Sequence, residues 1–514
     1  FIAGHASNSV AVALGMAQAR TALGEDYKVL ALIGDGALTG GLAYEGLSNA
    51  GQCGQQLLVI LNDNGMSITR NVGGVAQLLA RQRLKPKYLR FKQNYRRVMH
   101  AFWLGRQIYK VTHELKRALK QSLLPCSMFE DMGFTYLGPV DGHDVAQLTK
   151  TLRYASTLNE PVVLHIRTVK GKGFAPAEAN PDAFHGVSPF DPETGKALKS
   201  GGENFSAVFG RTLVRLARTD RRVCAMTAAM VSGTGLVPFS KAFPKRFFDV
   251  GIAEGCAVSM AAGMAKQGAV PVFAVYSTFL QRSYDQIIHD VNLLHENVVF
   301  AVDRAGFVPE DGETHQGIYD PAFLSQTGMP IYSPSNYEEL RHWLSILLSH
   351  EMQGPRAIRY PRGGESKALA KYGCSGKEYD KLIFTPGAKA ALVSYADEVE
   401  DVLAAAEMLA KEGIPCDVYK LVRIFPFEEE LIHDLSSYPV VLMAEECVAC
   451  GGIGEHLARA LQDAGWQGRY IHRAVRELCL PHATVPQIKQ VTGLDAAHLA
   501  EAVREADPKG EKTL

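Results

Sequence analysis

The chain has 514 residues, and its 54 lysines and arginines balance its 54 aspartates and glutamates, so the formal net charge is zero. Hydrophobic residues make up 47% and charged residues 21%, ordinary globular values that exclude a largely disordered chain. At about 150 residues per domain, the length predicts three domains, each able to bury its own core. The neutral total argues against an extended electrostatic surface, so we expect no nucleic acid and no membrane as partners.

Nine cysteines are too dilute for a disulfide scaffold and odd in number, so we expect reduced thiols in a cytoplasmic protein. Cys447 and Cys450 form one C-x-x-C motif, but no second Cys or His pair has zinc spacing. Two small residues beside a glycine turn are therefore favoured over a metal or redox site. No apolar run reaches the roughly 18 residues that span a bilayer.

The first third of the chain alternates helices and strands. Apolar strands are predicted at residues 29–33 and 57–61, and helices at residues 11–20 and 42–50. Near-continuous apolar strands separated by helices are typical of a parallel sheet that is covered on both faces.

A basic segment follows, from Arg81 to Lys120, which contains 13 lysines and arginines and a single acidic residue, Glu114. One interpretation is a surface for nucleic acid or another polyanion. A solvated connector pinned by its aromatic residues is favoured, because the segment lacks a compact recognition motif.

The alternating pattern resumes at Phe129 and continues in two further blocks. A loop rich in Gly, Pro and Asp over residues 171–202 predicts the first domain boundary, and a break over residues 363–379 predicts the second. Further strands are predicted at 161–167, 223–227, 270–276, 298–302, 390–394, 418–421 and 440–445, with helices at 399–411 and 454–463. We therefore predict an α/β protein of three successive domains with mainly parallel sheets, over residues 1–200, 203–365 and 380–514.

Polar residues follow the first two predicted strands at the point where each ends. Gly34-Asp35-Gly36 follows one strand, and Asn62-Asp63-Asn64 ends the next. Parallel sheets place ligand sites beyond the carboxyl ends of their strands, so the two loops can face one crevice. The glycines let the backbone approach a ligand, and carboxylate and amide oxygens suit magnesium shared with phosphate. A helix starting near Thr39 would offer its N-terminal amides to the same anion.

A Gly-Asp-Gly sequence alone indicates only a tight turn. With Asn64 placed 29 residues after Asp35, at the next strand end, the arrangement resembles the diphosphate-anchoring motif of thiamine-diphosphate enzymes. The resemblance implies that Asp35, Asn64 and the backbone carbonyl of Met66 hold magnesium. The residues that would line the cofactor in this part of the chain are Gly4, His5, Ala6, Gly36, Ala37 and Asn64.

Thiamine-diphosphate enzymes also need a carboxylate against the aminopyrimidine ring. Its hydrogen bond favours the imino tautomer, which removes the proton from the thiazolium carbon. We expect this acid to follow a strand and open a helix, as Glu254 does after a predicted strand at residues 248–252. In isolation Glu254 would be interpreted as a first-turn acid favoured by the helix dipole, but the metal motif favours the catalytic role.

Further motifs resemble, piece by piece and in order, those of the 1-deoxy-D-xylulose-5-phosphate synthase family. They are Pro139–Asp144, Lys170–Glu178, Phe184-His185, Tyr276–Gln286, Asp303–Gly306, Asp311–Gly317 and Arg359–Gly363. The resemblance covers nearly all of the chain and separates it from transketolase, whose overall plan is similar.

The resemblance implies a transketolase-like fold and a transferase that uses thiamine diphosphate and Mg²⁺. Its reaction would join pyruvate to D-glyceraldehyde 3-phosphate with loss of carbon dioxide. The product, 1-deoxy-D-xylulose 5-phosphate, feeds isoprenoid, thiamine and pyridoxal phosphate synthesis. The resemblance also implies a homodimer whose third domain serves dimerisation more than chemistry. The Glu445-Glu446 pair in that domain is interpreted as structural.

The resemblance assigns further site residues by position. Phe279 would stack on the pyrimidine ring, and Phe174 would also line the cofactor. Arg304 and Arg362 would bind the acceptor phosphate, a task suited to guanidinium geometry. The remaining catalytic candidates are Tyr276, Arg282, Asp311 and His315, of which Tyr276 and His315 would also bind substrate.

Several features depart from the family pattern. Gly255-Cys256 replaces the usual Gln-His after the glutamate, Ala6 replaces a serine, and Phe174 replaces a tyrosine. The family's chains also begin well upstream of Phe1, so we expect a fragment that folds poorly or is inactive alone. Two alternatives stay open: a different thiamine-diphosphate enzyme, and a degenerate relative that binds cofactor or a partner without turnover.

Overall fold

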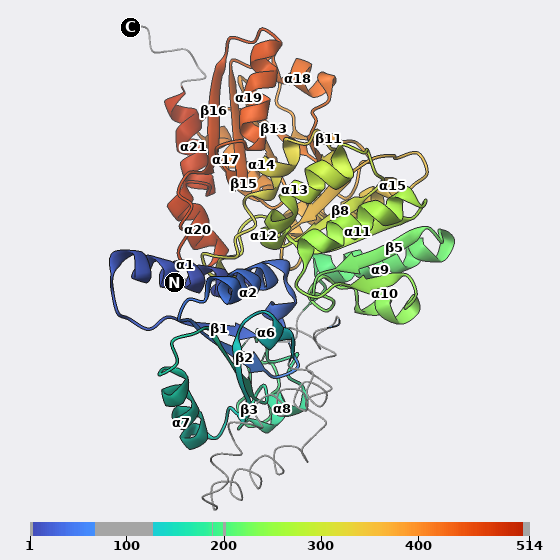
Figure 1. Cartoon of the computed structure of the whole chain (residues 1–514). Helices are drawn as coiled ribbons and strands as arrows, with labels where there is room; N and C mark the ends of the chain where they lie inside the picture. The colour runs from blue at the N-terminus through green and yellow to red at the C-terminus, as the bar shows by residue number, and fades with distance from the viewer. Residues whose placement is uncertain (1–3, 67–73, 75–126, 188, 199–201, 507–514) are drawn as a thin grey trace, which may run out of the picture. The chain divides into compact units, whose positions relative to one another are not determined.

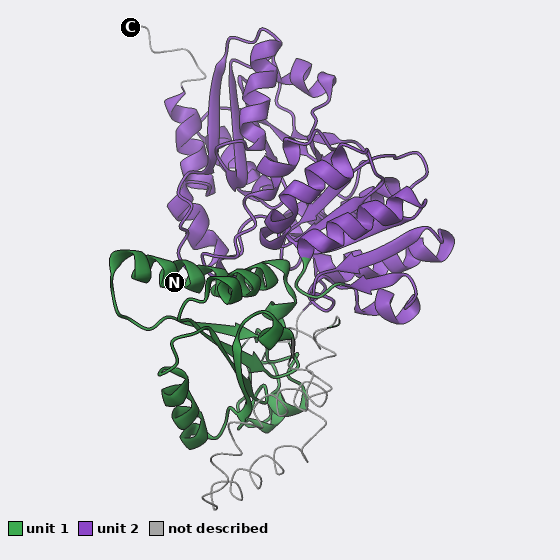
Figure 2. Cartoon of the chain, viewed as in Figure 1, with its two compact units in different colours: residues 1–200, 250–253 green, residues 201–249, 254–514 purple. Residues whose placement is uncertain are grey.

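A computed structural model of the chain describes residues 4–66, 74, 127–187, 189–198 and 202–506 (Figure 1). The basic segment Arg81–Lys120 lies outside the described residues. The chain divides into two compact units, residues 1–200 with 250–253, and residues 201–249 with 254–514 (Figure 2).

The first unit is built on a four-stranded parallel sheet with strand order β1-β2-β4-β3. Its strands are β1 (Leu30–Gly34), β2 (Leu58–Asp63), β3 (Thr135–Asp141) and β4 (Val162–Arg167). Its helices are α1 (Ser9–Leu23), α2 (Gly41–Cys53), α6 (Ser127–Asp131), α7 (Val145–Ala155) and α8 (Ala175–Ala179). Residues of α1, α2 and α6 share one apolar core with the sheet, whereas α7 packs into a second core, which confirms a sheet covered on both faces.

The helix predicted at residues 42–50 is confirmed as α2, but this helix does not extend back to Thr39. Residues Ala37–Thr39 form a short 3₁₀ turn, and α2 starts only at Gly41. Gly40 between them is extended, with φ −79° and ψ 143°. A Cβ atom at Gly40 would lie 2.3 Å from the Ser7 hydroxyl oxygen, so a close approach of two loops interrupts the helix at this glycine.

The second unit contains a seven-stranded sheet with strand order β14-β9-β10-β8-β7-β5-β6. Its strands are β5 (Val223–Thr227), β6 (Phe247–Asp249), β7 (Val270–Tyr276), β8 (Val299–Asp303), β9 (Ile331–Tyr332), β10 (Arg356–Tyr360) and β14 (Arg423–Phe425). All pairs are parallel except β14 with β9, so the third block of the sequence lends one antiparallel strand to this sheet. The strand predicted at residues 248–252 ends at Asp249, because Gly251 adopts a left-handed conformation with φ +74°.

Helices flank this sheet in the order of the predicted α/β pattern. They are α9 (Phe205–Thr219), α10 (Val237–Ala242), α11 (Glu254–Lys266), α12 (Ser277–Leu280), α13 (Tyr284–Gln286), α14 (Asp320–Ser325), α15 (Tyr337–Leu347) and α16 (Lys367–Ala370). The apolar faces of α9 and α15 pack into one core with the central strands. Glu254 opens α11, as the sequence predicts.

A five-stranded sheet with strand order β11-β13-β12-β15-β16 completes the second unit. Its strands are β11 (Tyr379–Ile383), β12 (Ala390–Tyr395), β13 (Cys416–Leu421), β15 (Val440–Val448) and β16 (Arg469–Val475). Its helices are α17 (Glu398–Lys411), α18 (Glu429–Leu435), α19 (Ile453–Asp463), α20 (Val485–Thr492) and α21 (Ala496–Glu505). Only β11 is antiparallel.

These three mainly parallel sheets confirm the predicted fold class, while the three domain boundaries stay a prediction. In the part of the chain that the structure describes, no helix combines the length and apolar character needed to cross a bilayer. Cys447 is buried, Cys450 is exposed, and both are free thiols. The C-x-x-C motif therefore forms no disulfide in this structure.

Two helical glycines make a matched test of the packing. A Cβ atom at Gly210 in α9 would lie 1.9 Å from the Gly235 carbonyl oxygen, whereas one at Gly263 in α11 would have open space within 4 Å. We expect Gly263→Ala to stabilise the protein by about 0.5–1 kcal/mol through helix propensity. Gly210→Ala should instead destabilise it by about 1–3 kcal/mol because the backbone must shift.

Chemical denaturation followed by circular dichroism measures both changes. Equal stability of Gly210→Ala and the unchanged chain would show that α9 and the Gly235 turn are not packed as described.

Candidate active site

The ends of β1 and β2 bring the predicted metal residues together. Parallel pairing sets Gly34 level with Asn62. The Asp35 carboxylate, only 2% exposed, accepts the backbone N–H of Gly65 at 2.8 Å and that of Asn64 at 3.4 Å. The Asn64 side-chain oxygen accepts the Met66 N–H at 2.9 Å. One carboxylate, one amide oxygen and one backbone carbonyl are thus held within a single loop cluster by the backbone.

The loop before α1 lies beside the turn after β1. The Ser7 hydroxyl donates to the carbonyl of Ala37 at 2.6 Å, and Ser7 itself has a positive φ of 78°. Residues 4–6 lead directly into this contact. The loop that contains Gly4, His5 and Ala6 is thereby held next to Ala37, while the role of these residues toward the cofactor stays a prediction.

Phe174 packs in an aromatic trio at the start of α8. Its ring centroid lies 5.5 Å from that of Phe184 and 5.8 Å from that of Phe190. The three rings hold the segment after β4 together. The role of Phe174 toward the cofactor stays a prediction.

A buried polar chain, which sequence reasoning missed, leads from β3 through β4 to the end of β2. The Tyr136 hydroxyl lies 2.7 Å from His165 Nδ1, and His165 Nε2 lies 3.1 Å from Asp63 Oδ2. Asp63 and His165 are 1% and 0% exposed. Because Asp63 immediately precedes Asn64, this chain fixes the end of β2. The sequence signal was a histidine that interrupts the apolar run of β4.

Glu254 is a buried carboxyl group at the first residue of α11. It is 3% exposed, and its Oε2 lies 3.3 Å from the Arg282 guanidinium. Burial raises the pKa of Glu254 above its ordinary value, and the charge of Arg282 opposes that rise. Two predicted catalytic residues therefore form one ion pair.

Tyr276 and Arg304 stand at the ends of adjacent parallel strands and stack on each other. The Arg304 guanidinium carbon lies 3.7 Å from the centroid of the Tyr276 ring. Arg304 also donates to the Gly233 carbonyl at 3.2 Å and to Asp303 at 3.3 Å. Burial raises the pKa of Tyr276 to about 12, so its phenol stays protonated near neutral pH.

Asp303 is a second residue whose role sequence reasoning missed. It is fully buried, and burial raises its pKa to about 6 against the opposing charge of Arg304. The Ser206 hydroxyl donates to its other oxygen at 2.7 Å. Arg304 has a positive φ of 58°, and Asp303 helps to hold it in that strained conformation.

Phe279 and His315 face each other across the site. Phe279 stacks on Tyr276 at a centroid distance of 5.9 Å, and His315 meets the Phe279 ring edge-on at 5.5 Å. His315 Nδ1 lies 2.8 Å from the Thr314 hydroxyl. Burial lowers the pKa of His315, and the charge of Asp311 opposes that change.

Arg362, which follows the end of β10, pairs with two acidic residues of the segment after β8. Its guanidinium lies 3.1 Å from Asp311 and 3.4 Å from Glu310, and its side chain is 38% exposed. The structure therefore gathers Tyr276, Arg304, Asp311 and Arg362 in one cluster with Phe279 and His315.

The helix that follows Tyr276 is anchored by a buried ion pair. The Ser277 hydroxyl donates to Asp320 Oδ1 at 2.7 Å, and the Arg359 Nε donates to Asp320 Oδ2 at 2.7 Å. Asp320 is fully buried. This pair fixes the start of α12, which carries Phe279. Sequence reasoning used Arg359 only as part of a motif and had no means of finding its partner 39 residues away.

Comparisons with known proteins identify the family. Family models match the chain in three places: 1-deoxy-D-xylulose-5-phosphate synthase over residues 1–168, the transketolase pyrimidine-binding domain over 203–364, and the transketolase C-terminal domain over 381–499. Among solved structures, the transketolase of Campylobacter jejuni subsp. jejuni NCTC 11168 has a TM-score of 0.50 at 17% identity. That match covers 97% of this chain and 81% of the transketolase chain. A split-gene transketolase matches 59% of this chain and 98% of its own, with 26% identity and a TM-score of 0.53.

Curated relatives are closer in sequence. The 1-deoxy-D-xylulose-5-phosphate synthase of Desulforudis audaxviator (strain MP104C) is 45% identical over 90% of this chain and 74% of its own length. The synthase of the same name from Heliobacterium modesticaldum (strain ATCC 51547 / Ice1) is 42% identical over 98% of this chain and 78% of its own length.

The shared fold and the matched pyrimidine-binding domain define the class: a thiamine-diphosphate-dependent transferase of the transketolase type. The first domain and the sequence identities then separate the chain from the transketolases. The chain belongs to the 1-deoxy-D-xylulose-5-phosphate synthase family.

The electrostatic influence of Asp311 on His315 can be tested by titration. Because the charge of Asp311 raises the pKa of His315, Asp311→Asn should lower that pKa further. The imidazole would then lose its proton at a lower pH than in the unchanged protein. Nitrogen-detected NMR of the histidine rings, with His315→Gln to assign the signal, measures the midpoint. Glu313→Gln removes a charge from the same loop and serves as control; an equal shift in both variants would contradict a specific influence of Asp311.

Proposed function

We propose that this chain catalyses the reaction for which its relatives are named: pyruvate and D-glyceraldehyde 3-phosphate are joined, with release of carbon dioxide, to 1-deoxy-D-xylulose 5-phosphate. The observation that carries the assignment is Glu254, a buried carboxyl group with a raised pKa at the first turn of α11. Thiamine-diphosphate enzymes need such a group against the pyrimidine ring. When bound, the cofactor supplies the carbon nucleophile that attacks the keto group of pyruvate.

Asp35, Asn64 and the carbonyl of Met66 would hold Mg²⁺ with the diphosphate of the cofactor. The donor set fits this ion, because magnesium prefers oxygen ligands and keeps few protein groups when it also binds phosphate. Asp35 is buried and held by two backbone N–H groups, so its carboxylate is fixed in place before any ligand binds. The described residues contain no cluster of three or more His, Cys, Asp and Glu suited to a metal, and this mixed set does not need one.

Glu254 would donate a hydrogen bond to the pyrimidine ring from its protonated form. A carboxyl group donates only when neutral, and burial favours the neutral form. Arg282, 3.3 Å away, fixes the orientation of the carboxyl group and limits the rise of its pKa. Phe279 would stack on the same ring from α12.

Arg304 and Arg362 would bind the phosphate of the acceptor aldehyde. The buried Arg304 Nε has no hydrogen-bond partner among the residues that the structure describes, so one donor remains for an anionic oxygen. Arg362 is more exposed and shares its charge with Asp311. Tyr276 remains a phenol and can donate to a substrate oxygen, while burial favours the neutral imidazole of His315, which can accept a proton.

Two of the departures from the family pattern, Gly255 and Cys256, directly follow Glu254. A Cβ atom at Gly255 would lie 3.0 Å from the Gln286 side-chain oxygen, and Cys256 is exposed with its sulfur 3.8 Å from that of Met260. The Arg282 pair and the burial of Glu254 persist without the usual Gln-His. This favours an active synthase over a degenerate relative.

An assay with both substrates tests the proposed reaction. We expect carbon dioxide release that depends on D-glyceraldehyde 3-phosphate and equals the 1-deoxy-D-xylulose 5-phosphate formed. Glu254→Gln should lower turnover at least about 100-fold because the amide cannot take part in proton transfer. Calorimetry should show that binding of thiamine diphosphate with Mg²⁺ is largely retained.

Glu407→Gln, on the exposed side of α17, controls for the loss of one carboxylate and should leave turnover unchanged. Ketose phosphate transfer without carbon dioxide release would instead indicate a transketolase. Full turnover in Glu254→Gln would refute the catalytic role of this residue.

We also propose that the protein is a homodimer in the cytoplasm. Support comes from its eight described cysteines, all of them free thiols, which suit a reducing compartment, and from the family to which the chain belongs. Light scattering coupled to size-exclusion chromatography should give about twice the 56.0 kDa of one chain. A monomer mass at micromolar concentration would contradict the dimer.

A further inference from the structure

The loop between β8 and α14 carries two of the proposed catalytic residues. It leaves β8 at Arg304 and contains Asp311 and His315. Two backbone hydrogen bonds close its base. The Gly306 N–H donates to the Gly317 carbonyl at 2.7 Å, and the Gly317 N–H donates to the Gly306 carbonyl at 2.9 Å. We refer to residues 304–317 as the substrate loop. The position of Asp311 and His315 depends on how this base is held.

A carboxylate from the third sheet holds the base of the substrate loop. Glu446, on β15, accepts the Phe307 N–H on Oε2 at 2.9 Å. A Cβ atom at Gly306 would lie 2.2 Å from the same oxygen, so the contact requires glycine at that position. Phe307 itself is buried in the core of the third sheet. The loop thus contacts the third sheet both through the backbone N–H of Phe307 and through the Phe307 side chain.

A buried ammonium group fixes the other oxygen of this carboxylate. Lys489 Nζ on α20 lies 3.1 Å from Glu446 Oε1, 2.9 Å from Glu398 and 2.7 Å from Asp401. Its side chain is only 7% exposed. Since Glu398 and Asp401 also compensate the charge of Lys489, loss of Glu446 leaves no isolated buried cation.

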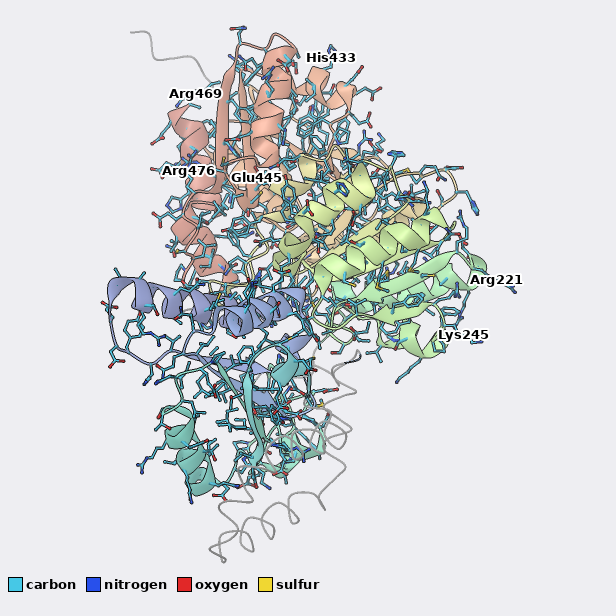
Figure 3. All side chains as sticks on the ribbon, in the orientation of Figure 1. Arg221, Lys245, His433, Glu445, Arg469 and Arg476 are labelled. Carbon is cyan, nitrogen blue, oxygen red and sulfur yellow. The ribbon has the colours of Figure 1, made fainter. Side chains whose placement is uncertain are left out.

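The preceding residue, Glu445, has a different and purely internal task. Figure 3 labels it among the strands of the third sheet. Its carboxylate accepts the Gly454 N–H at 2.8 Å and the Tyr395 hydroxyl at 2.8 Å, and it lies 2.8 Å from His472. All of these partners belong to the third sheet and its helices. Of the two consecutive glutamates, only Glu446 therefore contacts the substrate loop.

We propose that Glu446 is a positioning residue of the synthase reaction: the third domain uses it to hold the substrate loop, and with it Asp311 and His315, in place. The proposal rests on the proposed function for the roles of those two residues. It assigns the third domain a part in substrate binding in addition to any part in dimerisation.

Two substitutions test the proposal, each replacing a carboxylate by the amide of nearly the same shape and removing one negative charge. Glu446→Gln keeps the shape of the side chain but has one oxygen where two are needed, so it loses either the Phe307 N–H or the Lys489 contact. Asp401→Asn removes one carboxylate from the same Lys489, from helix α17 and not from the loop. Hydrogen–deuterium exchange of the full chain should be about tenfold faster over residues 304–317 in Glu446→Gln and unchanged in Asp401→Asn.

Steady-state kinetics give a second readout. Glu446→Gln should lower kcat/KM for D-glyceraldehyde 3-phosphate about tenfold, mainly through KM, while Asp401→Asn stays within about twofold of the unchanged chain. Combined with His315→Gln, the effect of Glu446→Gln should largely disappear, because both act through the same loop.

Gly306→Ala disturbs the same contact from the loop, and it replaces Glu446→Gln as the test variant if Glu446→Gln does not fold. The added Cβ would push the loop away from the carboxylate, so the same segment should exchange faster. Unchanged exchange over residues 304–317 in Glu446→Gln, or equal kinetic losses in Glu446→Gln and Asp401→Asn, would overturn the proposal. Absence of turnover in the unchanged chain would refute the proposed function, and the exchange result would still decide whether Glu446 holds the loop.

Discussion

Parallel strand register is the constraint that decides which side chains can meet in this protein. Tyr276, Asp303 and Tyr360 stand level at the ends of three adjacent strands, β7, β8 and β10. Whatever follows those residues therefore leaves the sheet at one edge, which brings together α12, the substrate loop and Arg362. The first unit repeats the arrangement on a smaller scale, with Gly34 level with Asn62. Neither cluster needs a large movement of the chain to form, because each is already assembled by the sheet.

Near these strand ends, some carboxyl groups are buried away from water. Burial raises the pKa of Asp303 to about 6 and that of Glu254 above its ordinary value, and in each case one arginine opposes the rise. The groups that contact each carboxyl group decide whether its charged or its neutral form is favoured. Asp303 also accepts a hydroxyl, which favours its charged form and suits a residue that holds Arg304. Glu254 is paired with Arg282 at the longer distance of 3.3 Å. In the proposed reaction, Asp303 would thus hold an arginine while Glu254 would act on the cofactor.

The sequence alone predicted the parts of this site that depend on local order. Asp35 and Asn64 follow two strands and Glu254 opens a helix, so periodicity and turn residues were enough to place them. The partners that arrive from far along the chain could not be predicted, because nothing local marks them. His165 lies 102 residues from Asp63, and Glu446 lies 139 residues from Phe307. The same reasoning explains the unexpected strand β14, which pairs with β9 only once the third block has folded back on the second sheet. The break at Gly40, which separates the turn at Thr39 from α2, was not predicted because it depends on a close approach to Ser7.

The network around Lys489 explains why a structural interpretation of the Glu445-Glu446 pair is incomplete. Burial and the charge of Glu446 raise the pKa of Asp397 to about 7, and burial raises that of Glu398 well above its ordinary value. An acidic group of this kind would be costly if its only purpose were stability, since apolar residues of similar volume often serve as well. A carboxylate, however, can bind a backbone N–H and an ammonium group at the same time, which no apolar side chain can do. Glu446 uses both oxygens in this way, one on Phe307 and one on Lys489. Its charge is therefore better explained by the loop that it holds than by the domain in which it lies.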